Sequence, residues 1–114
     1  MPNLAKKKCT ACEGEESPLT TEDGLHLLTE LGNAWKIVND HHLEKDYLFE
    51  DFKEALAFTN QVGEIAETEG HHPDIHLSWG KVRIVLWTHV INGLSENDFI
   101  LAAKCDAIPY KKKK

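Results

Sequence analysis

The chain has 114 residues and a mass of 12.9 kDa, with 41% hydrophobic and 28% charged residues. This size and mixture are typical of one globular domain and exclude a disordered chain or a coiled coil. Thirteen basic against nineteen acidic residues give a net charge of −6, which argues against nucleic-acid binding through a broad basic face. The longest apolar run, residues 84–87, is far shorter than the roughly 20 residues of a membrane span.

The two ends of the chain are polar. Residues 1–18 are expected to form an N-terminal arm, and residues 109–114 a disordered basic tail, which leaves residues 19–108 as a single domain. The basic start leads into no apolar segment, so we expect no secretion signal. Three cysteines are an odd number, and Cys105 falls in a helical pattern. A disulfide framework is therefore not expected, and a reducing cytoplasm is the simplest location.

Capping residues and apolar spacing predict seven elements in the central domain. Helices are predicted over 20–31, capped by Thr20, over 51–70, capped by Asp51, and from Ser95 to about residue 105. Alternating apolar residues predict strands over the following ranges: 34–38, 43–49, 74–79 and 82–89. Short hairpins favour antiparallel pairing, so we expect an α+β fold, a four-stranded antiparallel sheet with three helices on one face, in the order α-β-β-α-β-β-α. The middle helix is apolar on more than one side, which predicts a subunit partner.

Histidines are the most informative residues. The chain has seven of them, and four lie between positions 71 and 89. His71 and His72 follow a helix stop and precede a strand, and the hairpin returns His89 toward them, so all three are expected around one cleft. Asp98 enters from the first turn of the last helix. Imidazoles in one cleft suit proton transfer or metal binding, and a carboxylate such as Glu67 or Asp98 can orient an imidazole.

Simpler interpretations exist for most of these side chains. Asp98 is also a capping residue, and Glu67 lies late in a helix where a solvated side chain is common. Cys9 and Cys12 have the spacing of half a zinc site or of a redox pair, but no second CxxC exists. They are interpreted as a free thiol pair, with metal binding or reversible disulfide formation as the alternative. Other aromatic residues and histidines receive structural interpretations: Trp79 and Trp87 as core, and His26, His41 and His42 as surface.

Taken together, these residues resemble the pterin-4a-carbinolamine dehydratase family, of bacterial type. The family pattern is an acidic residue, three positions, His-His-Pro, an aromatic residue after a short gap, nine positions to another histidine, and an aspartate further on. Seven residues of this chain meet it: Glu67, His71, His72, Pro73, Trp79, His89 and Asp98. The likeness covers about residues 20–106. Many animal members have Trp where this chain has Ile75, so an aromatic wall of the pocket is missing or supplied from elsewhere.

The resemblance implies dehydration of 4a-hydroxytetrahydrobiopterin to quinonoid dihydropterin and water by histidine general acid/base catalysis. This recycles the cofactor of an aromatic amino-acid hydroxylase, and the protein needs no cofactor or metal of its own. The implied catalytic residues are His71, His72 and His89, with Glu67 and Asp98 in support. The implied pterin-binding residues are His71, His72, Pro73, Thr88, His89, Val90 and Ile91.

The resemblance also implies a homodimer or homotetramer. Members of the family are often described with the first and last histidines as the acid–base pair and the middle one holding the pterin. Which histidine is the acid and which the base stays open. The alternative function is a non-catalytic binding or dimerisation module of the same fold.

Overall fold

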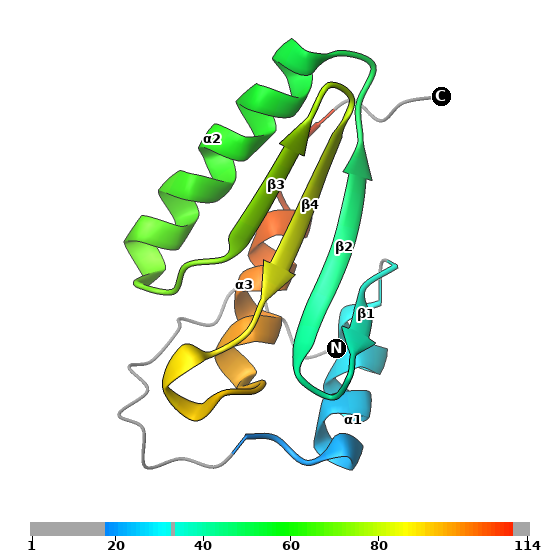
Figure 1. Cartoon of the computed structure of the whole chain (residues 1–114), viewed down its shortest axis with the longest axis vertical. Coiled ribbons are helices and arrows are strands. Elements are labelled where there is room, and N and C mark those ends of the chain that lie inside the picture. Colours follow the sequence, from blue (N-terminus) through cyan, green and yellow to red (C-terminus); the bar gives the residue numbers. More distant parts are fainter. Residues whose placement is uncertain (1–17, 33, 111–114) are drawn as a thin grey trace.

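The computed structural model describes residues 18–32 and 34–110. Within this part of the chain, four strands form one antiparallel sheet in the order β1-β2-β4-β3 (Figure 1). The elements are α1 (Thr21–Leu31), β1 (Lys36–Val38), β2 (His42–Leu48), α2 (Phe52–Glu69), β3 (Asp74–Ser78), β4 (Lys81–Leu86), the short 3-10 helix η2 (His89–Ile91) and α3 (Glu96–Asp106). The predicted α+β class and the order α-β-β-α-β-β-α are confirmed.

Side-chain caps begin the three α-helices where the sequence predicts them. The Thr20 hydroxyl accepts from the Asp23 N–H at 3.1 Å, and the Asp51 carboxylate accepts from the Glu54 N–H at 2.8 Å. Ser95 and Asp98 form a reciprocal capping box on α3. Each cap satisfies an N–H group that has no partner inside the helix, which fixes where the helix starts.

Alternation along β4 decides which face of the sheet is covered. Val82, Ile84 and Leu86 are fully buried, whereas the intervening residues are half-buried. The three helices lie over the face that these residues share (Figure 1). On the other face Arg83 donates to Asp46 at 2.8 Å. One face therefore forms the core and the other remains polar, as antiparallel sheets permit.

The fourth strand ends earlier than the sequence predicts. Strand 82–89 was expected, but β4 stops at Leu86, and His89 begins η2. Thr88 forms an isolated bridge with Gly93, to which its N–H donates at 2.8 Å. Gly93 has no room for a side chain, because an added Cβ would lie 2.8 Å from Pro18 Cβ. The prediction was wrong at this end because the pairing of Thr88 is decided by a turn and not by the alternation of residues 82–89.

Several large apolar side chains lie at the surface. Trp79 is 64% exposed at the β3–β4 turn, so its interpretation as a core residue was wrong. Phe52 and Leu56 are exposed on α2, while Ala55 and Phe58 of the same helix are fully buried. The helix thus has apolar residues on a second side, as predicted. None of the helices in the described ranges is long and apolar enough to cross a membrane.

The carboxylate of Asp106, whose side chain is 11% exposed, holds the end of α3 against the sheet. Asp106 accepts from Trp35 Nε1 at 2.8 Å, from Lys45 Nζ at 2.7 Å and from the Tyr47 hydroxyl at 2.5 Å. Burial, followed by the charge of Asp106, raises the pKa of Tyr47 far above its ordinary range. Tyr110, at the start of the predicted basic tail, packs its ring against Tyr47 at a centroid distance of 5.4 Å. These contacts fix α3 at the end opposite to its capping box.

The thiol of Cys105 gives the fold a pH dependence. Burial, and then the charge of Asp106, raise the pKa of Cys105 from 9.0 to about 12. The protonated thiol's contribution to stability is fully present below pH 9 and is lost as the pH rises toward 12, because the thiol of the unfolded chain ionises first. We expect the thiol to lower the free energy of unfolding by up to about 1.4 kcal/mol per pH unit there. Urea unfolding should show that the free energy of unfolding falls less steeply with pH for Cys105→Ala than for the wild type. Equal slopes for the two proteins would contradict the assignment of this pH dependence to the Cys105 thiol.

Candidate active site

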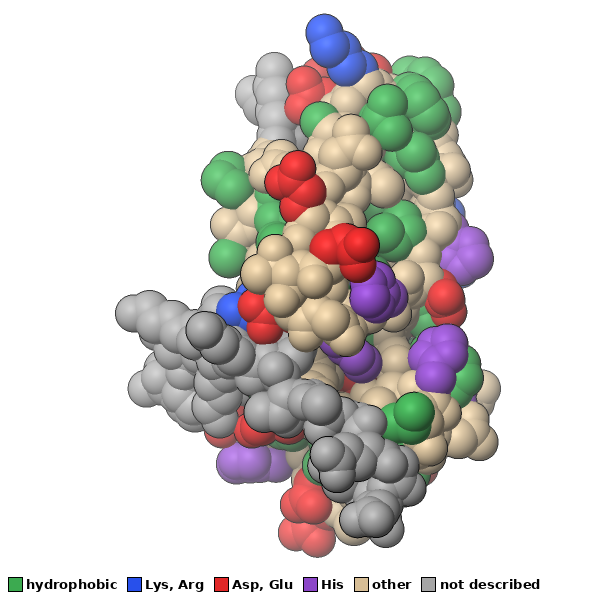
Figure 2. All heavy atoms as spheres, turned by 90° about the vertical axis from the view of Figure 1, so that its left-hand side faces the viewer, with side chains coloured by type: hydrophobic (Ala, Val, Ile, Leu, Met, Phe, Trp, Pro, Cys, Tyr) green, Lys and Arg blue, Asp and Glu red, His purple; other side chains and the backbone are tan. Residues whose placement is uncertain are grey.

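A cavity of about 570 Å³ lies where the α2–β3 junction meets the segment after β4. His71 and His72 enter it from the junction, which begins at Gly70, the left-handed end of α2. His89 enters it from the start of η2. The lining residues are Glu69, Gly70, His71, His72, Pro73, Asp74, Trp87, Thr88, His89, Val90 and Asn97. In Figure 2 several histidine side chains lie close together beside acidic ones on the face shown.

His71 is held by a buried carboxylate. Its Nε2 lies 2.5 Å from Asp98 Oδ1, and the Asp98 side chain is 0% exposed against 13% for His71. An ionised carboxylate only accepts hydrogen bonds, so Nε2 of His71 carries the proton. In neutral His71, Nδ1 is then the nitrogen that can accept a proton. The pair sets both the tautomer and the orientation of the ring.

Asp98 is itself fixed by one hydroxyl and one backbone N–H. Its Oδ2 accepts from Thr88 Oγ1 and from the Ser95 N–H, each at 2.9 Å. Because the Thr88 hydroxyl hydrogen points to Asp98, the 2.8 Å contact between Thr88 Oγ1 and Ser95 Oγ is donated by Ser95. In the described part of the chain, no buried side-chain nitrogen or oxygen lacks a hydrogen-bond partner. The network therefore holds Asp98 in one position behind His71.

His72 has a carboxylate partner of a different kind. Its Nε2 lies 2.6 Å from Glu67 Oε2, but the two side chains are 61% and 78% exposed. Ion pairs this exposed contribute at most about 1 kcal/mol. The two histidine–carboxylate pairs thus differ in burial, and only the His71–Asp98 pair is shielded from water.

The difference in burial gives a stability prediction for Glu67. We expect Glu67→Gln to change the free energy of unfolding by less than about 0.5 kcal/mol, because water screens the pair that it removes. Urea unfolding of the variant beside the wild type measures this. A loss of several kcal/mol would show that the Glu67 carboxylate is more deeply involved in the fold than its exposure indicates.

His89 is oriented by an aromatic ring. The Trp87 indole stacks on its imidazole with a centroid distance of 3.9 Å and an interplanar angle of 17°. Within the described residues the His89 side chain forms no hydrogen bond, and this stack is its one ring contact. Trp87 is half-buried and lines the cavity. Its interpretation as a core residue was wrong, and it supplies an aromatic wall to the cavity, which Ile75 does not line.

The structure separates the candidate residues into three groups. His71, His72, Pro73, Thr88, His89 and Val90 line the cavity together. Asp98 lies buried behind them, and Glu67 reaches them only through His72. Ile91 is buried and does not line the cavity.

Sequence reasoning missed five lining residues: Glu69, Gly70, Asp74, Trp87 and Asn97. Trp87 stands two positions before His89, so the alternation of residues 82–89 already put both on one face. That spacing could have revealed the contact. Among the described side chains, no three His, Cys, Asp or Glu residues converge closely enough to hold a metal ion. Cys9 and Cys12 lie outside the described residues.

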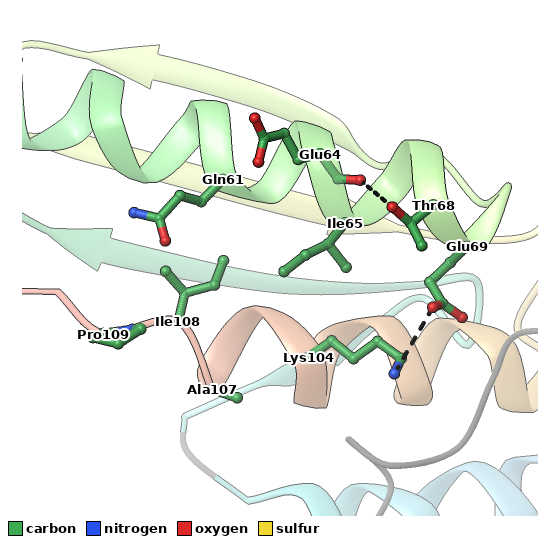
Figure 3. Close-up of a pocket in the computed structure, with 9 residues that line it drawn as sticks. All are labelled: Gln61, Glu64, Ile65, Thr68, Glu69, Lys104, Ala107, Ile108 and Pro109. Atoms are coloured by element: carbon green, nitrogen blue, oxygen red, sulfur yellow. Dashed lines mark hydrogen bonds and ion pairs between the residues drawn. The ribbon is translucent and has the colours of Figure 1, made fainter.

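A second cavity, of about 530 Å³, lies between the C-terminal half of α2 and the end of α3 (Figure 3). Lys104 Nζ lies 3.9 Å from Glu69 Oε2 across it. Its lining residues include no histidine or cysteine: Gln61, Glu64, Ile65, Thr68, Glu69, Lys104, Ala107, Ile108 and Pro109. The histidine cavity therefore remains the candidate for acid–base chemistry.

The α+β fold places two histidine–carboxylate pairs beside one cavity, a geometry suited to proton transfer. Comparison with known families identifies the family to which this fold and site belong. The model of the family "Pterin 4 alpha carbinolamine dehydratase" matches residues 17–108, and the chain belongs to this family.

Relatives with known sequences carry the name of the same family. A protein of Alkaliphilus metalliredigens, named "Putative pterin-4-alpha-carbinolamine dehydratase", is 54% identical over 106 residues, covering 93% of this chain and 96% of that one. A protein of the same name from Rubrobacter xylanophilus is 45% identical, covering 95% and 100%. These matches extend over nearly the whole of both chains.

Two solved structures are similar in fold. A transcriptional coactivator/pterin dehydratase from Brucella melitensis superposes with a TM-score of 0.74 and 30% identity, covering 80% of this chain and 97% of that one. A pterin dehydratase-like protein described as a RuBisCO assembly factor in the alpha-carboxysome has a TM-score of 0.57 and 24% identity, covering 68% and 90%. The second likeness concerns the fold alone.

Proposed function

We propose that the chain dehydrates a 4a-hydroxytetrahydropterin to the quinonoid dihydropterin. In this reaction a proton leaves N5, the N5–C4a double bond forms, and the C4a–O bond breaks. The departing hydroxyl takes up a proton and leaves as water. The two protons balance and no electrons pass to another molecule, so one base and one acid suffice.

The proposed acid–base pair is His71 and His89, with His72 holding the pterin. The observation that carries this proposal is that His71 and His89 line one cavity while buried Asp98 holds His71 at 2.5 Å. An imidazole with one nitrogen bound to a carboxylate exchanges protons through the other nitrogen, and the carboxylate stabilises the imidazolium that forms. Volumes near 570 Å³ are also typical of small-ligand sites.

The substrate class implies a source and an assembly. A tetrahydropterin hydroxylated at C4a is the product that an aromatic amino-acid hydroxylase leaves, so we propose such an enzyme as the functional partner, in the cytoplasm. We also propose a homodimer or homotetramer. The exposed Phe52 and Leu56 on α2 support a subunit contact, because exposed apolar residues on a helix favour burial against a partner.

A coupled assay tests the proposed reaction. A tetrahydropterin-dependent hydroxylase generates the carbinolamine, and absorbance follows its decay with and without this protein. We expect faster decay, in proportion to the protein added. Unchanged decay across a wide range of protein concentration would contradict the proposal.

A binding or dimerisation module of the same fold is the second candidate. The description of the Brucella melitensis structure, which joins coactivator and dehydratase, favours keeping it. Such a module requires the fold but not the histidine chemistry. It predicts unchanged carbinolamine decay together with capture of a protein partner.

A further inference from the structure

His41 lies at the turn between β1 and β2 and reaches the segment that carries His89. Its Nε2 lies 3.0 Å from Asn92 Oδ1, and its ring lies 4.4 Å from the Trp87 ring. The register of the sheet explains the approach, since Leu43 at the start of β2 pairs with Leu86 at the end of β4. The β1–β2 turn and the segment after β4 therefore lie at the same end of the sheet (Figure 1). His41, which the sequence analysis interpreted as a surface residue, is half-buried and makes both of these contacts.

The two residues that His41 contacts, Trp87 and Asn92, lie before and after His89 in the sequence. Trp87 precedes His89 and stacks on it, while Asn92 ends η2 in a left-handed conformation, with φ of 50°. The Asn92 N–H donates to the His89 carbonyl at 3.1 Å. His41 thus contacts the residue that orients the His89 ring and the residue that closes the turn around its backbone.

The orientation of the His41 ring is itself determined. With Asn92 Oδ1 as acceptor, Nε2 of His41 carries a proton, so Nδ1 of neutral His41 is an acceptor. The Nδ1 of His42 lies 3.2 Å from this atom and can donate to it. Two hydrogen bonds on opposite nitrogens hold the His41 ring against the indole.

His89 depends on this support more than the other two cavity histidines do. His71 is held by Asp98 and His72 by Glu67, each through a hydrogen bond. In the described part of the chain, His89 has only the Trp87 stack. A stacked ring without a hydrogen bond keeps its orientation only as long as its neighbour is fixed. Anything that holds the indole therefore also aligns His89.

We propose that His41 is a positioning residue of the active site, acting through Trp87 and Asn92 on His89. The catalytic part of this inference rests on the proposed dehydratase function. If His89 loses its alignment, kcat falls while substrate contacts to His71 and His72 persist. Misplacement of a reacting group by about 1 Å can cost roughly 100-fold in rate.

The variants separate the two contacts of His41. His41→Ala removes both the ring and the hydrogen bond, while His41→Gln keeps a donor for Asn92 and loses the ring. We expect kcat to fall about 10- to 100-fold for His41→Ala with little change in KM, and less for His41→Gln. His26→Ala is the matched control, because its side chain is 75% exposed on α1. Its kcat should equal that of the wild type.

Nuclear magnetic resonance of the His89 ring tests the positioning without any activity. The indole ring current shifts the ring protons of a stacked imidazole upfield, and Trp87→Leu gives the fully unstacked reference. We expect His41→Ala, in folded protein, to move the His89 signals part of the way to that reference. Unchanged His89 signals in both His41 variants would overturn the proposal. If the wild type lacked dehydratase activity, the proposed function would fail, while the shifts would still decide whether His41 positions His89.

Discussion

His71→Ala and His89→Ala are each expected to lower the rate of carbinolamine dehydration by about 10²–10⁴-fold, the usual contribution of one placed proton donor or acceptor. Both imidazoles line the same cavity, and the reaction needs one proton removed and one delivered. Steady-state kinetics in the coupled assay measure the loss. The double variant should lose much less than the product of the two single effects, because residues that act as a unit are not additive.

A histidine outside the cavity provides the control for these variants. His76 lies exposed on β3, two residues from the end of the strand, and does not line the site. His76→Ala should therefore keep the wild-type rate and stability. Wild-type rates for His71→Ala and His89→Ala as well would contradict the assignment of either residue to proton transfer.

Asp98→Ala is expected to have the largest effect on stability. The substitution leaves the donors on His71, Thr88 and Ser95 facing a buried site with no acceptor. Breaking a buried charge-assisted network in this way costs about 3–5 kcal/mol. Urea unfolding should show this loss, in contrast to the small change expected for Glu67→Gln. A cost below about 1 kcal/mol would mean that the network contributes little.

Asp98→Asn tests the same carboxylate where Asp98→Ala fails to fold. The amide keeps the shape but replaces one acceptor oxygen with a donor, so it cannot satisfy His71 and Thr88 together. When the oxygen of the introduced amide accepts from Thr88 and Ser95, its NH₂ group faces His71. The His71 ring then has no acceptor for its Nε2 proton, or it takes the other tautomer. We expect kcat to fall by about 10²-fold or more, because the wrong tautomer presents the wrong nitrogen. Full activity in Asp98→Asn would contradict the role of Asp98 in setting the tautomer.

The fold could be predicted because its signals are local. Thr20, Asp51 and Ser95 cap helices at the predicted starts, and the alternation of Val82 and Ile84 reports a half-buried strand. The end of β4 could not be predicted in the same way. The Thr88 hydroxyl donates a hydrogen bond to Asp98, and the Thr88 N–H donates to the Gly93 carbonyl. Both contacts depend on the turn that follows.

The candidate site could be predicted only where its residues are close in sequence or share a motif. His71 and His72 are adjacent, and His89 and Asp98 follow at family spacing. The contacts of His41 could not be predicted in this way, because His41 and its partner Asn92 are 51 residues apart in the sequence. No local pattern distinguishes a histidine at a hairpin turn that contacts a distant indole from one that faces water. Register between β2 and β4 brings them together, and register is a tertiary property.

The most direct test of the central claim is the rate of carbinolamine dehydration by the wild type and by the His71→Ala/His89→Ala double variant, in chelator throughout. We expect the wild type to accelerate the decay and the double variant to lose at least about 10²-fold of this acceleration while remaining folded. Equal acceleration by the two proteins, or none by the wild type, would contradict histidine acid–base catalysis at this site.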